Sequence, residues 1–164
     1  MLHRDLKLAN VMIHFNELGN ELVGSNKMNE FIKNFNFEEN HNQMTCKIAD
    51  LGFARRVEAA LDFKAGTSCG TPLYMAPEVI NGLPYSHESD VWSMGCLFYG
   101  MLFGSMPFPA RSINELRNIL AKGSFKIPKD GKLSVAGMQF LQQMLTFDQQ
   151  DRITWTALAT HTYL

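Results

Sequence analysis

Three side chains near the start of the sequence could together carry acid–base and metal chemistry: Asp5, Lys7 and Asn10. A carboxylate can accept the proton of an attacking hydroxyl group, and a lysine can neutralise a phosphoryl group during its transfer. An amide oxygen is a suitable Mg²⁺ ligand. Three such residues so close together also occur in ordinary solvated turns, so this segment alone leaves both interpretations open.

A second candidate metal ligand stands in the tripeptide Asp50-Leu51-Gly52, which follows the short apolar run 46–49. A carboxylate at the end of a strand could supply another oxygen ligand to Mg²⁺. The glycine would permit the backbone conformation that aims the carboxylate. An isolated Asp-x-Gly is far more often a turn, so its order after the first segment is what makes it a candidate.

Four segments form longer motifs around these residues. They are His3-Arg4-Asp5-Leu6-Lys7-Leu8-Ala9-Asn10, Asp50-Leu51-Gly52, Gly70-Thr71-Pro72-Leu73-Tyr74-Met75-Ala76-Pro77-Glu78 and Asp90-Val91-Trp92-Ser93-Met94-Gly95. They resemble, in this order, four elements of eukaryotic serine/threonine protein kinases: the H-R-D-L-x-x-x-N catalytic loop, the D-F-G element with Leu in the Phe position, the A-P-E end of the activation segment, and D-x-W-S-x-G. The resemblance covers residues 1–164. The residues of these motifs are most similar to those of the ULK-type, autophagy-initiating kinases.

The resemblance implies a role for each matching side chain. Asp5, Lys7 and Asn10 would be catalytic, with Asp5 as the base that accepts the hydroxyl proton. Asn10 and Asp50 would bind Mg²⁺. ATP would contact both of them together with Lys7 and Met12, the latter as the floor under the adenine. Thr71 would position the substrate hydroxyl group.

The resemblance also implies supporting and regulatory residues. Asp90 would hold the catalytic loop at its backbone N–H groups, although an acidic residue at a helix N-terminus is stabilising in any case. Arg152 would pair with Glu78, and His3 would support the loop. Arg4 would neutralise a phosphate on the activation segment, with Thr67 and then Ser68 as the candidate sites. The alternative is that these two hydroxyl groups are never modified.

The elements that must position these residues are a strand pair and a set of helices. The runs 9–13 and 46–49 predict two strands. Eight Asn residues between 14 and 43 indicate a polar surface insertion, partly disordered. Four apolar side chains in it leave open whether a short helix docks there: Phe31, Ile32, Phe35 and Phe37.

Helical periodicity dominates the second half of the chain. A buried helix is expected over 86–103, followed by helices that begin at Ser112, with a Ser-x-x-Glu capping box, and at Ser134. A last helix is expected over 155–161. With the long loop 50–77, this predicts an α+β kinase-like fold: a mainly α-helical C-lobe with a short β pair that carries the catalytic loop and the D-L-G element.

Composition excludes several classes of function. The 15 Lys+Arg against 16 Asp+Glu give a net charge of −1 without blocks of like charge, which argues against binding of nucleic acid or of an anionic membrane surface. Residues 91–110 are uncharged but are interrupted by Gly, Ser and Pro, so a core helix is favoured over a membrane span. Three widely spaced cysteines fit a reducing, cytoplasmic location better than a disulfide framework.

The function that the resemblance implies is transfer of the γ-phosphoryl group of Mg²⁺-bound ATP to Ser or Thr of a protein substrate. The 164 residues contain no Gly-x-Gly-x-x-Gly loop and no V-A-I-K strand. We therefore expect a truncated kinase domain, the C-lobe without its N-lobe, that is inactive by itself. The buried face of 91–103 would be partly uncovered and open to the missing lobe or to a partner. The alternative is a catalytically silent module that binds proteins.

Overall fold

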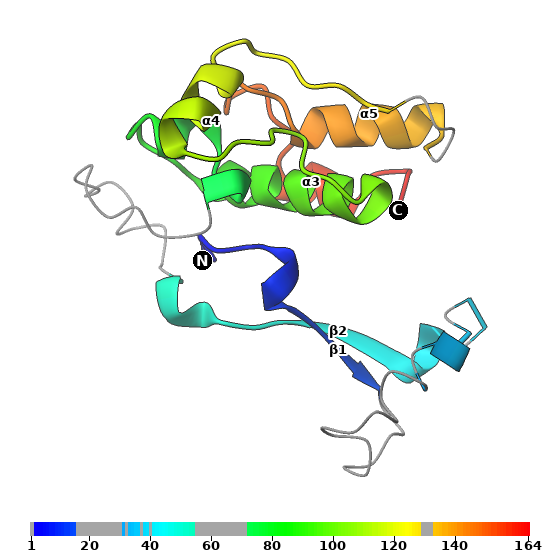
Figure 1. Cartoon of the computed structure of the whole chain (residues 1–164). Helices are drawn as coiled ribbons and strands as arrows, with labels where there is room; N and C mark the ends of the chain where they lie inside the picture. Colours follow the sequence, from blue (N-terminus) through cyan, green and yellow to red (C-terminus); the bar gives the residue numbers. More distant parts are fainter. Residues whose placement is uncertain are drawn as a thin grey trace. The chain divides into compact units, whose positions relative to one another are not determined.

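The computed structural model describes residues 2–15, 31, 33–36, 38–39, 41–54, 72–128 and 133–164. They fall into two compact units, Met1–Leu8 with Asp50–Leu164, and Ala9–Ala49. The first unit is helical, and the second is built on an antiparallel strand pair (Figure 1). None of the helices in the described part of the chain has the length and hydropathy that a membrane span requires.

The smaller unit is a hairpin of β1 (Val11–Phe15) and β2 (Met44–Ile48), paired from Val11 with Ile48 to Phe15 with Met44. β1 therefore extends two residues into the predicted insertion 14–43, and β2 begins directly after it, two residues before the predicted run 46–49. The prediction placed the first strand too early because Leu8–Asn10 forms a turn of 3-10 helix, η1, which removes Ala9 and Asn10 from the ladder.

The base of the insertion is closed by an aromatic cluster. Phe15, at the end of β1, lies 5.1 Å from both Phe31 and Phe35 between ring centroids, and those two lie 5.2 Å from each other. Residues 31, 33 and 34 are helical. A helical turn thus docks on the strand end, which answers the question that the sequence left open. Ile32 and Phe37 lie outside the described residues.

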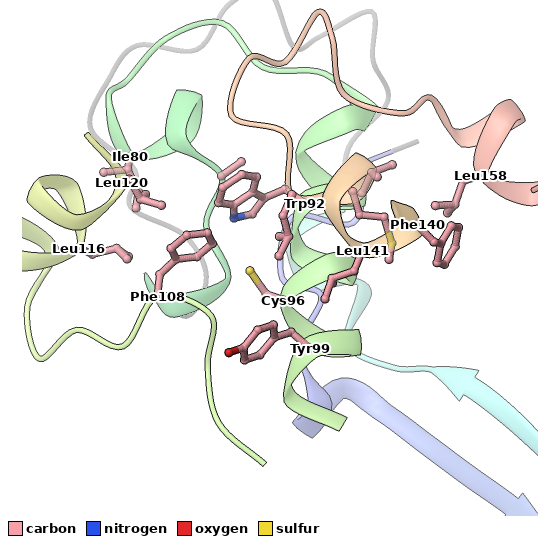
Figure 2. Close-up of a cluster of buried hydrophobic side chains, with 14 residues drawn as sticks. Ile80, Trp92, Cys96, Tyr99, Phe108, Leu116, Leu120, Phe140, Leu141 and Leu158 are labelled. Carbon is pink, nitrogen blue, oxygen red and sulfur yellow. The ribbon is translucent and has the colours of Figure 1, made fainter. Parts of the chain in front are cut away.

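The larger unit is organised around α3 (His87–Phe103), which begins after Ser86 and ends at Gly104 in a left-handed conformation (φ 66°). Figure 2 shows Trp92, Cys96 and Tyr99 on the side of α3 that faces Phe108. The Trp92 and Phe108 rings stack at 5.1 Å. Burial raises the pKa of the Cys96 thiol, against the opposing charge of Arg152, so this thiol is a neutral core side chain.

The face of α3 that the sequence predicts to be partly uncovered is buried at the start of the helix and partly exposed toward its end. Val91, Trp92 and Cys96 are completely buried, because α5 and the segment around Phe108 pack against them. Further along the helix, Leu97 is partly exposed and Met101 is 60% exposed.

The remaining helices surround α3. They are α2 (Pro77–Ile80), α4 (Ile113–Leu120), α5 (Val135–Met144) and α6 (Trp155–Ala159), the last being shorter than predicted. The hydroxyl groups of Ser112, Ser134 and Thr154 cap three of them, as the sequence indicates. The capping box of α4 is incomplete, since Glu115 accepts a hydrogen bond from the N–H of Arg111 rather than from that of Ser112.

Two glycines of α3 predict opposite responses to substitution by alanine. A Cβ at Gly95 would lie 2.8 Å from Leu145 Cδ2 and 3.0 Å from Met144 Cβ, where α3 and α5 meet, whereas a Cβ at Gly100 would lie 3.8 Å from its nearest neighbour. Overpacking costs about 1–3 kcal/mol, while alanine favours a helix over glycine by about 1 kcal/mol. Urea unfolding should therefore show Gly95→Ala less stable than Gly100→Ala. Equal stability of the two variants would contradict the close approach of these helices.

Candidate active site

The loop around Asp5 is fixed to the central helix through Asp90, in the first turn of α3. One carboxylate oxygen of Asp90 accepts the N–H of His3 at 2.7 Å, and the other accepts the N–H of Arg4 at 2.9 Å. Asp90 is only 5% exposed; its bond with His3 is buried, and its bond with Arg4 is partly buried. The central helix α3 thus holds the backbone of the two residues directly before Asp5.

The backbone at Arg4 is strained. Its φ of 72° is left-handed, a conformation that costs a residue other than glycine on the order of 1–3 kcal/mol. Two contacts hold it there: the bond from its N–H to Asp90, and the approach of its guanidinium to within 5.8 Å of the Tyr85 ring centroid. On the other side of the strained residue, the N–H of Asp5 donates to Nδ1 of His3 at 3.3 Å.

Asp5 and Lys7 form an ion pair on this loop. Lys7 Nζ lies 2.8 Å from Asp5 Oδ2, and the side-chain exposures are 24% for Lys7 and 3% for Asp5. The carboxylate is therefore an acceptor with a cation beside it, inside a backbone that Asp90 holds. Such an arrangement can accept a proton from a hydroxyl group and neutralise negative charge on a group that the hydroxyl attacks.

Asp50 is presented on an exposed turn. It caps the short 3-10 helix η4 (Leu51–Phe53), and its Oδ1 accepts the N–H of Gly52 at 3.3 Å. The left-handed residue is Asp50 itself (φ 62°), whereas Gly52 has no positive φ. Gly52 acts instead by leaving room, because a Cβ there would lie 3.2 Å from Asp50 Oδ1. Leu51, in the position of the family's Phe, is 56% exposed.

Asn10 and Met12 belong to the hairpin unit. Asn10 is 7% exposed. Its backbone carbonyl group accepts a hydrogen bond from the backbone N–H of Ala49, the residue before Asp50, at 2.8 Å. Met12 lies in β1 and is 55% exposed. An amide and a carboxylate suit Mg²⁺, which prefers oxygen ligands and keeps several waters. The described ranges contain no group of three His, Cys, Asp or Glu side chains placed to hold a metal.

Glu78 and Arg152 join α2 to the turn before α6 in a buried, bidentate ion pair with N···O distances of 2.7 and 3.0 Å. Arg152 is 2% exposed, and its guanidinium lies 5.0 Å from the ring centroid of Trp92. Its other N–H groups donate to three backbone carbonyls, of Thr146, Glu88 and Phe147. The sequence did not predict that Ser89 also donates to Glu78, at 2.7 Å.

Comparison with known proteins decides what this arrangement is. The family model described as "Protein kinase domain" matches residues 1–164, the whole of the sequence given. The chain belongs to the protein kinase family. The α+β kinase-like fold that the motifs predicted is thereby confirmed, with its helical body and its small antiparallel sheet.

Curated proteins similar to this chain carry the names of protein kinases, several of them of serine/threonine kinases. Serine/threonine-protein kinase 33 of Bos taurus is 33% identical over 166 residues, covering 100% of this chain and 30% of that protein. Serine/threonine-protein kinase 36 of Pongo abelii is 36% identical over 118 residues, covering 72% of this chain and 9% of that protein. Maternal embryonic leucine zipper kinase of Xenopus laevis is 37% identical over 119 residues, covering 72% of this chain and 18% of that protein. The chain thus spans less than a third of the length of these kinases.

Three predicted residues of the kinase motifs lie outside the described residues: Thr67, Ser68 and Thr71. Of the other candidates, His3, Asp5, Lys7, Asp50, Glu78, Asp90 and Arg152 belong to the larger unit, as does Arg4. Asn10 and Met12 belong to the smaller one.

The anchoring of the kinase loop by Asp90 predicts slow hydrogen exchange close to the N-terminus. The amides of His3 and Arg4 should be protected in the purified chain because both donate to a buried carboxylate. A hydrogen bond to a charged group contributes about 1.5–3 kcal/mol, so Asp90→Ala should speed exchange at both amides by about ten- to a hundredfold. The measurement is amide exchange by NMR, with Asp148→Ala as the surface control. Unprotected His3 and Arg4 amides in the wild type would contradict the anchor.

Proposed function

We propose that the protein containing these residues is a serine/threonine kinase, which transfers the γ-phosphoryl group of Mg²⁺-bound ATP to Ser or Thr of a protein substrate. The observation that carries this proposal is the buried Asp5 carboxylate, paired with Lys7 on a backbone fixed by Asp90. The kinase motif around it and the serine/threonine kinases among the relatives support the same conclusion.

In the proposed reaction, the substrate hydroxyl oxygen attacks the γ-phosphorus, and the bond from that phosphorus to the β,γ-bridging oxygen breaks, so that ADP leaves. Asp5 receives the hydroxyl proton. Lys7 neutralises negative charge on the transferring group. Asn10 and Asp50 would hold Mg²⁺, which when bound would neutralise charge on the phosphate oxygens. Thr71 would orient the hydroxyl group.

Several finer assignments rest on the motifs alone. Met12 would contact the adenine, and Thr67 or Ser68 would carry a regulatory phosphate opposite Arg4. A cytoplasmic location and a place in the ULK-type branch remain predictions, and the relatives above carry other kinase names.

The 164 residues taken alone should bind Mg²⁺-bound ATP weakly. They include the residues proposed for Mg²⁺ and for the adenine floor but no glycine-rich phosphate loop, so the phosphates would remain in contact with bulk water. Calorimetric titration of the purified chain should give a Kd weaker than micromolar. A micromolar Kd would show that these residues form a sufficient nucleotide site.

The proposed function is tested on the full-length product of the gene with γ-labelled ATP, Mg²⁺ and three peptides identical except for Ser, Thr or Tyr at the acceptor position. Label should appear on the Ser and Thr peptides and not on the Tyr peptide. Preference for Tyr would overturn the substrate class. Absence of transfer to all three peptides would contradict the proposed enzymatic function and favour the alternative, a catalytically silent module that binds proteins.

A further inference from the structure

Tyr85 lies directly before the central helix, next to Ser86, the N-cap residue of α3. The kinase motifs give it no role, since it falls between the segments 70–78 and 90–95. Its side chain is partly buried, and the guanidinium carbon of Arg4 lies 5.8 Å from its ring centroid, within the range of a cation–π contact. Because Asp90 stands in the first turn of α3, the start of this helix contacts the loop at two points, the backbone and the Arg4 side chain.

The second contact matters because Arg4 has a left-handed backbone. Its φ of 72° is unfavourable for a residue with a Cβ, and such a conformation persists only where its surroundings hold it. The bond from the Arg4 N–H to Asp90 orients the peptide group before Arg4. That bond does not restrain rotation about the N–Cα bond of Arg4, which is the rotation that φ measures.

Rotation about this N–Cα bond moves two groups together: the Arg4 side chain and the peptide group that leads to Asp5. On the second group, the bond from the Asp5 N–H to Nδ1 of His3 is long at 3.3 Å. The Tyr85 ring restrains the first group by holding the guanidinium. A change in φ would displace the Asp5 backbone and with it the carboxylate that pairs with Lys7.

We propose that Tyr85 is a positioning residue for the reaction: its ring holds the guanidinium of Arg4 and thereby maintains the left-handed turn that places the Asp5 carboxylate. The inference rests on the proposed function, in which Asp5 receives the hydroxyl proton. Tyr85 should affect kcat rather than the KM for ATP, because neither Tyr85 nor Arg4 is among the residues proposed to contact the nucleotide. The ring should matter more than the hydroxyl group, because a cation–π contact uses the ring face.

The restraint on the loop is tested by amide hydrogen exchange in the purified 164-residue chain, which requires no phosphoryl transfer. Tyr85→Leu should speed exchange at the amides of Arg4 and Asp5 about two- to fivefold, as expected for loss of a partly exposed cation–π contact. The amide of Cys96, in the buried part of α3, reports unfolding of the whole unit and should keep its rate. Tyr85→Phe, which keeps the ring face, should keep the wild-type rates at all of these amides.

Two further variants assign the effect to this contact. In an Arg4→Met chain, which lacks the cation, adding Tyr85→Leu should not speed exchange at Asp5 any further, because the two substitutions remove the same interaction. Tyr163→Leu is the matched control, since this tyrosine is also partly buried and its ring contacts that of Phe140. It should leave the amides of Arg4 and Asp5 unchanged.

The effect on the reaction is tested by label transfer to the Ser peptide with the full-length protein. Tyr85→Leu should lower kcat about two- to fivefold and leave the KM for ATP unchanged, whereas Tyr85→Phe should retain most of the wild-type kcat. Thermal unfolding of each variant, recorded beside the kinetics, shows whether the fraction of folded protein is the same.

Unchanged exchange at Arg4 and Asp5 in Tyr85→Leu, equal acceleration at Cys96, or equal effects of Tyr85→Leu and Tyr85→Phe would each overturn the inference. A Tyr85→Leu enzyme with the wild-type kcat would also overturn it and would leave the proposed function intact. Faster exchange at Arg4 and Asp5 in Tyr85→Leu, without label transfer by the wild type, would contradict the proposed function and retain the restraint on the loop.

Discussion

Asp5→Asn is expected to lower kcat for peptide phosphorylation by the full-length protein by about 10²- to 10⁴-fold, the usual contribution of a general base. An amide of the same shape cannot take up the hydroxyl proton. The KM for ATP should change little, because the assigned role of Asp5 concerns the hydroxyl group rather than the nucleotide. Steady-state assays of label transfer give both constants.

The control for this substitution is Asp148→Asn, at an exposed position far along the chain, which should keep the wild-type kcat. Asp5→Asn also removes the ion pair with Lys7, so the thermal unfolding of the variant must be recorded beside its kinetics. A folded Asp5→Asn protein with wild-type kcat would remove Asp5 from the mechanism.

Arg152→Met should cost about 3–5 kcal/mol of unfolding free energy, the largest stability effect expected here. The substitution leaves the Glu78 carboxylate 5% exposed and without its cation, and it deprives three backbone carbonyls of donors. Since whole domains are stable by only about 5–15 kcal/mol, the loss should be visible as a large shift in urea unfolding.

The double variant Glu78→Leu with Arg152→Met separates two effects on stability: the cost of leaving the Glu78 carboxylate buried without its cation, and the loss of the packing of Arg152. It should be more stable than Arg152→Met alone, because no unpaired carboxylate remains buried. Arg111→Met, at an exposed arginine without an ion pair among the described residues, should lie within about 0.5 kcal/mol of the wild type. An Arg152→Met chain as stable as Arg111→Met would contradict the structural role of the pair.

The sequence predicted those features that a motif specifies side chain by side chain. Asp90 was expected to accept backbone N–H groups of the loop, and the structure has it bonded to His3 and Arg4. The first residues of the helices could also be predicted from the sequence, because a capping hydroxyl group bonds to an N–H in its own turn, as Ser134 does.

Other features depend on the partners that the fold brings together, and sequence could not supply them. The left-handed backbone fell on Asp50 rather than on the neighbouring glycine. The Glu115 carboxylate accepts the N–H of Arg111, not that of Ser112 as a complete capping box requires. The insertion could be assigned a docked helical turn only once Phe31 and Phe35 were seen to share Phe15 as a neighbour, because Asn-rich composition alone favours disorder.

The central claim is that Asp50 belongs to the metal site of a phosphotransfer enzyme. Its most direct test is the rate of γ-phosphoryl transfer to the Ser peptide by the full-length protein as Mg²⁺ is raised from zero at fixed ATP, in the wild type and in Asp50→Asn. We predict a rate that is absent without Mg²⁺ and saturates in the wild type, and that stays near background in Asp50→Asn at every concentration. Transfer that proceeds without Mg²⁺, or an Asp50→Asn protein with the wild-type Mg²⁺ dependence, would contradict the account.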